Sequence, residues 1–118
     1  MKYTSLFAGL LFSLVSLADD SAPDCGDAEL VASTIASDVI QYSCYFGSRK
    51  VRTVLIKSGI RVFDGQYNET GELHGPFAML TVDGGIWLKG NYRNGVKVGR
   101  WMEFDAETMK AQEVVHPD

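Results

Sequence analysis

Gly71-Glu-Leu-His-Gly75-Pro-Phe77-Ala-Met-Leu80 recurs twenty-four residues later in the chain as Gly95-Val-Lys-Val-Gly99-Arg-Trp101-Met-Glu-Phe104. Glycine falls on glycine at two positions, and an aromatic residue falls on an aromatic residue at a third. A repeat at a fixed spacing of this size is typical of chains built from stacked supersecondary units. Such units usually form binding or scaffolding surfaces rather than catalytic clefts.

The repeat extends beyond these two segments. Gly65-Gln-Tyr67 recurs as Gly90-Asn-Tyr92, twenty-five residues later. The clearest complete unit therefore runs from Gly71 to Tyr92, between imperfect copies at Gly47–Tyr67 and Gly95–Val115. Terminal units of a stack are expected to be atypical, because one of their sides faces water.

The local chemistry of the units predicts antiparallel hairpins. Ser58-Gly59, Asp83-Gly84 and Asn94-Gly95 separate runs that are rich in β-branched and aromatic residues. Asp-Gly favours a type I′ turn, in which both central residues have positive φ. The spacing of the runs is that of an all-β meander, and we expect about six strands in an elongated, single-layer or weakly curved sheet.

The part of the chain before the repeats is harder to interpret. Alternation of side chains predicts a strand over Val39–Phe46. For Glu29–Ile35, apolar residues near helical spacing and β-branched residues favour helix and strand about equally.

The N-terminus has the pattern of a secretory signal peptide. Lys2 precedes an apolar run over Leu6–Leu17, and the small residues Ser16 and Ala18 mark a cleavage site. This pattern predicts a signal peptide at residues 1–18 and a mature protein in the periplasm or outside the cell. The mature chain then divides into an N-terminal segment, residues 19–46, and a repeat sheet, residues 47–115.

Cys25 and Cys44 are the two cysteines of the chain. An even cysteine count in an exported chain predicts a disulfide, and two cysteines allow one pairing. The bond would tie the N-terminal segment to the start of the first repeat. The spacing of cysteines and histidines does not match a redox or metal motif.

Composition and motifs narrow the function classes. The formal net charge is −4, and loss of Lys2 with the signal peptide makes it −5, which disfavours nucleic acid as a partner. No nucleophile motif or phosphate-binding loop is present in the sequence, so we expect a protein that is not an enzyme and that uses no cofactor or metal. His74 and His116 are expected to be surface histidines, the second near a frayed C-terminus.

The large aromatic residues are the candidate interaction surface. Phe77, Trp87 and Trp101 are expected to share one face of the sheet, because side chains alternate between faces along a strand. They would either pack among themselves or form a partner surface, since exposed aromatic patches mark interaction sites. Tyr67 and Tyr92 are expected to hold adjacent hairpins together. The opposite face is expected to include Leu80, Leu88, Met102 and Phe104.

The spacing of glycines and aromatics resembles the bacterial variant of the MORN (membrane occupation and recognition nexus) repeat. The resemblance covers roughly residues 47–115, and it is clearest from Gly65 to Phe104. The residues that define the repeat are Gly71, Gly75, Gly90, Tyr92, Gly95 and Gly99.

This resemblance implies a sheet of stacked hairpins that binds other proteins or, less readily here, lipid head groups. The chain has few units, and Val51 stands where the first unit should have its second glycine, so a long lipid-binding array is not expected. The expected function is an exported protein-binding or scaffolding module. The alternative is an antitoxin-like or immunity-like protein that neutralises one toxin in the cell envelope.

Overall fold

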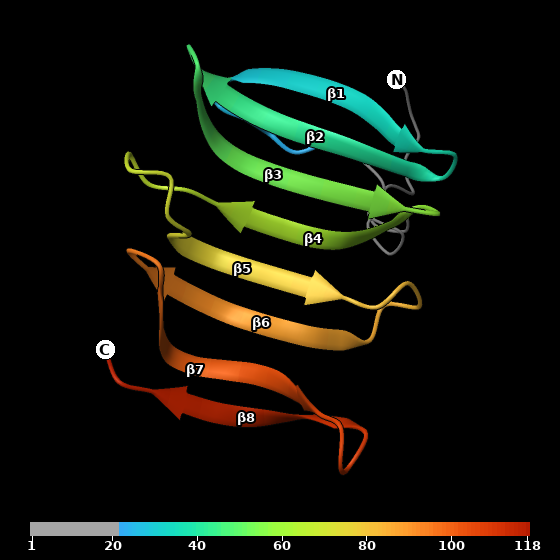
Figure 1. The fold of residues 1–118 in the computed structure, drawn as a ribbon, viewed down its shortest axis with the longest axis vertical. Coiled ribbons are helices and arrows are strands. Elements are labelled where there is room, and N and C mark those ends of the chain that lie inside the picture. Colours follow the sequence, from blue (N-terminus) through green and yellow to red (C-terminus); the bar gives the residue numbers. More distant parts are fainter. Residues whose placement is uncertain (1–21) are drawn as a thin grey trace, which may run out of the picture.

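The structure is a computed structural model that describes residues 22–118. The predicted signal peptide, residues 1–18, lies outside the described residues. The fold is all-β, with eight antiparallel strands that follow one another across a single open sheet (Figure 1). The strands are β1 Glu29–Ala36, β2 Val39–Phe46, β3 Arg49–Lys57, β4 Ile60–Gln66, β5 Gly75–Leu80, β6 Ile86–Arg93, β7 Val96–Asp105 and β8 Lys110–His116.

The prediction of a hairpin meander is confirmed, and the six strands expected of the repeats are β3 to β8. The predicted strand over Val39–Phe46 is confirmed as β2, and together with β1 it extends the repeat sheet to eight strands. In β1, the strand alternative is confirmed over Glu29–Ala36. Pairing with β2 resolves the ambiguity, because the ladder from Glu29↔Tyr45 to Ala36↔Val39 provides backbone hydrogen-bond partners.

Two of the three predicted tight turns have the expected backbone. Both central residues have positive φ in Ser58-Gly59, at 52° and 81°, and in Asn94-Gly95, at 49° and 86°. The type I′ prediction for Asp83-Gly84 is wrong, since only Gly84 has positive φ. Here the chain makes a longer turn, in which the Gly84 N–H donates to the Thr81 carbonyl at 2.9 Å. The Thr81 hydroxyl in turn accepts from the Gly85 N–H, so a side chain defines this turn.

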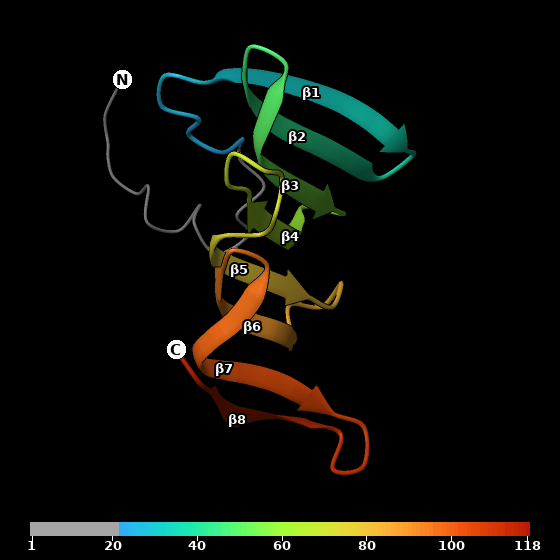
Figure 2. The same cartoon turned by 60° about the vertical axis from the view of Figure 1, so that its left-hand side comes forward.

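The sheet is one layer thick, and a short segment crosses one of its faces. In Figure 1 the described residues before β1 pass behind the N-terminal strands, and in Figure 2 they stand out to the left. Cys25 of this segment is bonded to Cys44 of β2, with their Cα atoms 5.5 Å apart, so the predicted disulfide is confirmed. The described residues contain no helix, and thus none that is long and apolar enough to span a membrane.

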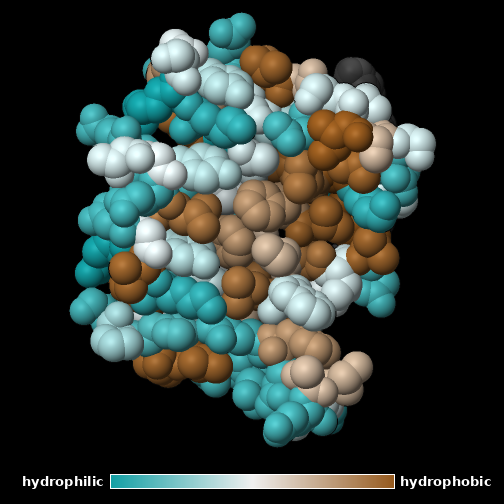
Figure 3. All heavy atoms as spheres, in the orientation of Figure 1, coloured by the Kyte–Doolittle hydropathy of each residue, from teal (hydrophilic) through white to brown (hydrophobic). Residues whose placement is uncertain are grey.

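The strand register defines two faces of the sheet. Phe77 lies opposite Gly90, and Trp101 packs on Gly90 from the same side, so this side is called the aromatic face. Asp64 lies opposite Ala78 on the other side, together with Cys44 and the N-terminal segment. The face turned to the viewer, opposite that segment, has apolar side chains gathered along its middle and mostly hydrophilic ones along its left-hand edge (Figure 3).

Candidate binding surface

A row of rings crosses the aromatic face from β4 to β8. The Phe77 ring contacts Phe63 and Tyr92 edge-on, with centroid distances of 5.4 and 5.2 Å. Tyr92 then contacts Trp101 at 4.9 Å, and Trp101 contacts His116 at 6.2 Å. Edge-to-face contacts at these distances are favourable beyond the area that they bury. The row therefore connects five consecutive strands through side chains as well as backbone.

Gly90 makes this row of rings possible. A Cβ atom at Gly90 would lie 2.3 Å from the ring of Trp101, which is closer than any real contact. The indole of Trp101 thus occupies the space above the glycine backbone. Its Nε1–H donates to the carbonyls of Asn91 and Val98, at 3.0 and 3.1 Å, where the β6–β7 register shifts. Close packing against the Trp101 ring therefore explains why the repeat has a glycine at position 90. The same ring gives a hydrogen-bond donor to two backbone carbonyls at the bulge.

The other repeat-defining residues have two distinct roles. Tyr92 packs between Phe77 and Trp101, as expected of a residue that holds adjacent hairpins together. Tyr67, which directly follows β4, donates a hydrogen bond from its hydroxyl to Thr53 of β3 at 3.3 Å. The remaining glycines of the repeat have positive φ, a conformation that other residues rarely adopt, and they are Gly71, Gly75, Gly95 and Gly99.

The three aromatic residues predicted to form a shared surface are separated by the sheet. Phe77 and Trp101 are only 5% and 1% exposed, so they form the core of the aromatic face. Trp87 is 48% exposed and stacks on Phe104 at 4.8 Å, on the opposite face. The expectation of one face for all three was wrong, because Trp87 is an odd number of residues from Gly90 along β6. Leu88 was also misplaced, since it pairs with Met79 on the aromatic face.

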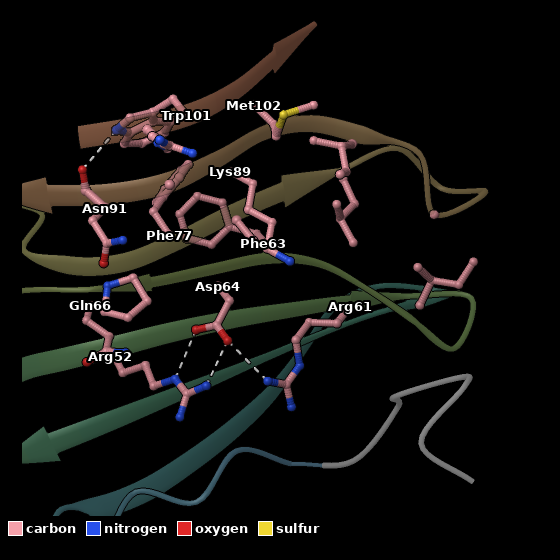
Figure 4. A pocket seen from close by; sticks show the side chains of 18 of the residues that line it. Arg52, Arg61, Phe63, Asp64, Gln66, Phe77, Lys89, Asn91, Trp101 and Met102 are labelled. Atoms are coloured by element: carbon pink, nitrogen blue, oxygen red, sulfur yellow. Dashed lines mark hydrogen bonds and ion pairs between the residues drawn. The ribbon is translucent and has the colours of Figure 1, made fainter. Parts of the chain in front are cut away.

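The face opposite the rings contains an open hollow of about 930 Å³. Figure 4 shows part of its lining, with charged side chains from β3 and β4 below and residues of β5 to β7 above. The register assigns most of its polar lining to this side, which is called the hollow face. Its apolar lining on this side comes from Pro76, Ala78, Leu80 and Met102.

The hollow is lined by more positive than negative charge. Arg52 binds the Asp64 carboxylate with two hydrogen bonds, at 2.9 and 2.7 Å, and Arg61 binds the same carboxylate at 3.1 Å (Figure 4). Lys89 also lines the hollow, as does the pair of Arg100 and Glu113, whose charged atoms lie 3.5 Å apart. Four cations and two carboxylates leave a formal charge of +2 in a chain whose net charge is −4.

A second charged cluster lies at the end of the row of rings. Glu103 accepts hydrogen bonds from His116 at 2.7 Å and from Lys97 at 3.2 Å, and Lys97 also lies over the Trp101 ring at 4.9 Å. The hydrogen bond from His116, assisted by Lys97, lowers the pKa of the Glu103 carboxyl below its ordinary value of 4.5. The expectation that His116 belongs to a frayed end was wrong, because it ends β8 in a pair with Gly99.

His74 is exposed, as expected, and it has a specific structural contact. Its Nδ1 accepts a hydrogen bond from the Asn94 backbone N–H at 3.0 Å. Asn68 reaches the same turn, since its side-chain amide donates to the Asn94 side chain at 2.9 Å. Together these bonds join the turn before β5 to the turn before β7, which are equivalent turns of successive repeat units.

The described side chains at these surfaces are charged and apolar groups of the kind that protein interfaces contain. Across residues 22–118 there is no group of three or more histidine, cysteine or acidic side chains placed to hold a metal ion. The hollow offers guanidinium and ammonium donors beside apolar carbon, which suits a carboxylate-bearing segment with an apolar side chain. Sequence reasoning missed the hollow because its lining comes from strands that are far apart along the chain, and only the register brings them together.

Comparison of the chain with models of protein families, with curated proteins and with solved structures finds no match. The function must therefore be inferred from the residues themselves.

Proposed function

We propose that this protein is an exported, non-enzymatic protein-binding module of the MORN-like type, which captures its partner on the hollow face. The observation that carries the proposal is the hollow itself. An open sheet presents a recess of about 930 Å³ whose lining combines four basic side chains with apolar residues. A protein interface of this kind needs apolar anchors together with paired polar groups around them.

The charge of the hollow defines the partner. A local charge of +2 on a chain of net charge −4 favours an acidic protein segment, and charge complementarity of this kind directs encounter and register. An anionic membrane surface is a weaker candidate. A flat bilayer faces a large part of the molecule and not the hollow alone, so the net negative charge of the chain is repelled by it. We expect Trp87, half-exposed on the same face, to extend the contact area.

We propose that the protein acts outside the cytoplasm. Disulfides persist in oxidising compartments, so the Cys25–Cys44 bond supports a periplasmic or secreted location. The sequence pattern of residues 1–18 supports the same location through a signal peptide cleaved near Ala18.

The antitoxin-like or immunity-like role is the second candidate. It is favoured by the small size of the sheet, since the eight strands of residues 22–118 form a few repeat units rather than a long array of equivalent sites. Deletion of the gene distinguishes the two roles. An immunity protein protects the cell only when one cognate toxin is present, whereas a scaffolding module is needed without any toxin.

The test uses affinity capture from an envelope extract, followed by binding measurements with the purified partner. Lys89→Glu reverses an exposed charge in the hollow. Lys110→Glu is the matched control, since Lys110 is also exposed but lies on the aromatic face, opposite Asp105 in the β7–β8 ladder. We expect Lys89→Glu to weaken binding at least about tenfold and to reduce its salt dependence, and the control to change it less than about twofold. Equal effects of the two variants would exclude the hollow as the binding site.

A further inference from the structure

β1 is an edge strand that is covered on neither face. All eight of its residues are exposed, and successive side chains of a strand point to opposite faces. Within residues 22–118, β2 is the one strand that pairs with β1, so the outer edge of β1 presents backbone N–H and C=O groups to no described strand (Figure 1). Such an edge is a template for pairing with another strand.

The two edges of the sheet differ in how they are protected. β8 contains the charged residues Lys110 and Glu113, and charged side chains are a common means of preventing edge-to-edge pairing. β1 has one charged residue, Glu29, and no proline. Its large exposed apolar residues lie on both faces, and they are Leu30, Val31 and Ile35.

We propose that β1 pairs in antiparallel fashion with β1 of a second copy of this chain, which joins two sheets across a two-fold axis. The position of Glu29 favours this orientation. Antiparallel pairing places the two Glu29 side chains at opposite ends of the strands, about 20 Å apart, beyond the screening length of about 10 Å. Parallel pairing would place the two carboxylates side by side.

The geometry of the pairing follows from its symmetry. A two-fold axis that relates adjacent antiparallel strands is perpendicular to the sheet, so each face of one copy continues into the same face of the other. Val31 of one copy therefore meets residues of its own face in the second copy. The register shift between Thr34 and Ala36 limits regular pairing to the segment Glu29–Thr34. A segment of this length forms a small interface, so the dimer is expected to dissociate on dilution.

The experiment measures the oligomeric state of the full-length chain, expressed in an exporting host and purified in the oxidised form. Sedimentation velocity from about 1 to about 300 µM should show a monomer that converts to a dimer. Val31→Lys places a charge in the proposed interface from both copies, and it should weaken dimerisation at least about tenfold. The matched control is Val115→Lys on β8, because Val115 is 70% exposed against 44% for Val31, and it should leave the dimer unchanged.

Amide hydrogen exchange gives a second readout. The amides of β1 should become more protected as the concentration rises, whereas those of β8 should not. A wild-type chain that stays monomeric to the highest concentration would overturn the proposal, as would a dimer that Val115→Lys disrupts and Val31→Lys does not. The outcome is independent of the proposed function, since the hollow is tested separately by Lys89→Glu.

Discussion

The N-terminal and C-terminal parts of this sheet are stabilised in different ways. In β2 and β3, the segment bearing Cys25 crosses one face of the sheet, and buried Cys44 and Val54 lie on that face. In β5 to β8, by contrast, rings from neighbouring strands pack on one another, and Trp101 fills the space above Gly90. A single-layer sheet has no second layer to bury its apolar side chains. The comparison shows two solutions to this problem, a covalently attached segment and a row of aromatic rings that pack on one another and on Gly90.

Loss of the Trp101 ring should have the largest effect on the stability of the C-terminal part. Trp101→Ala removes the largest buried side chain and two hydrogen bonds, and it should lower the free energy of unfolding by about 4 kcal/mol. Trp87→Ala is the matched control, because Trp87 is half-exposed, and it should cost about 1 kcal/mol. Urea unfolding followed by circular dichroism measures both values. Similar losses for the two variants would contradict the assignment of Trp101 to the core.

Loss of the disulfide should affect the N-terminal part. Cys25→Ser/Cys44→Ser opens a loop of 19 residues in sequence separation, which should lower stability by about 3 kcal/mol. The measurement is hydrogen exchange, which should show faster exchange in β1 and β2 than in β6 and β7. The oxidised wild-type chain should also contain no titratable thiol before reduction. Uniform loss of protection over all strands would mean that the two parts are not stabilised separately.

A larger side chain in place of Gly90 should have an intermediate effect on stability. Gly90→Ala places a methyl group 2.3 Å from the Trp101 ring, so the ring must move, at a cost of about 2 kcal/mol. At Gly65 the nearest side-chain atoms are 3.2 Å from the same position, and Gly65→Ala should cost less. Thermal unfolding and the near-ultraviolet tryptophan signal measure the two changes. A larger loss for Gly65→Ala would show that ring packing on Gly90 is not the limiting contact.

The smallest expected effect is on the acid dependence of the C-terminal part. The pKa of Glu103 is lower in the folded chain than its ordinary value of 4.5, so the folded state favours the carboxylate. This contribution to stability is complete above that value and is lost as the pH falls through the lowered pKa. Because the cluster is partly exposed, the contribution is below about 1 kcal/mol. Glu103→Gln should therefore flatten the loss of stability below pH 4.5, and His116→Ala should raise the carboxyl titration midpoint in NMR. A midpoint unchanged by His116→Ala would contradict the assigned cause.

Much of the local structure could be predicted from the residues. Asn94-Gly95 determines its hairpin, because both central residues have positive φ, a conformation that asparagine and glycine adopt readily. At Ser58-Gly59 the glycine at the second position is the residue that favours the turn. The cysteine pair was predictable for a different reason, since the two cysteines of the chain allow one intramolecular pairing. The turn at Asp83 was not, because the Thr81 hydroxyl competes for the backbone groups that a type I′ turn would use.

The sequence by itself determined the repeat, the hairpin class and the disulfide, because each depends on residues close in the chain or on a pairing without alternatives. Only the tertiary structure decided the strand character of β1, the separation of Trp87 from Phe77 and Trp101, and the gathering of Arg52, Asp64 and Lys89 around one hollow. The physical reason is register. A shift of one residue between neighbouring strands moves every following side chain to the other face, and the bulges that set these shifts arise from pairing between strands.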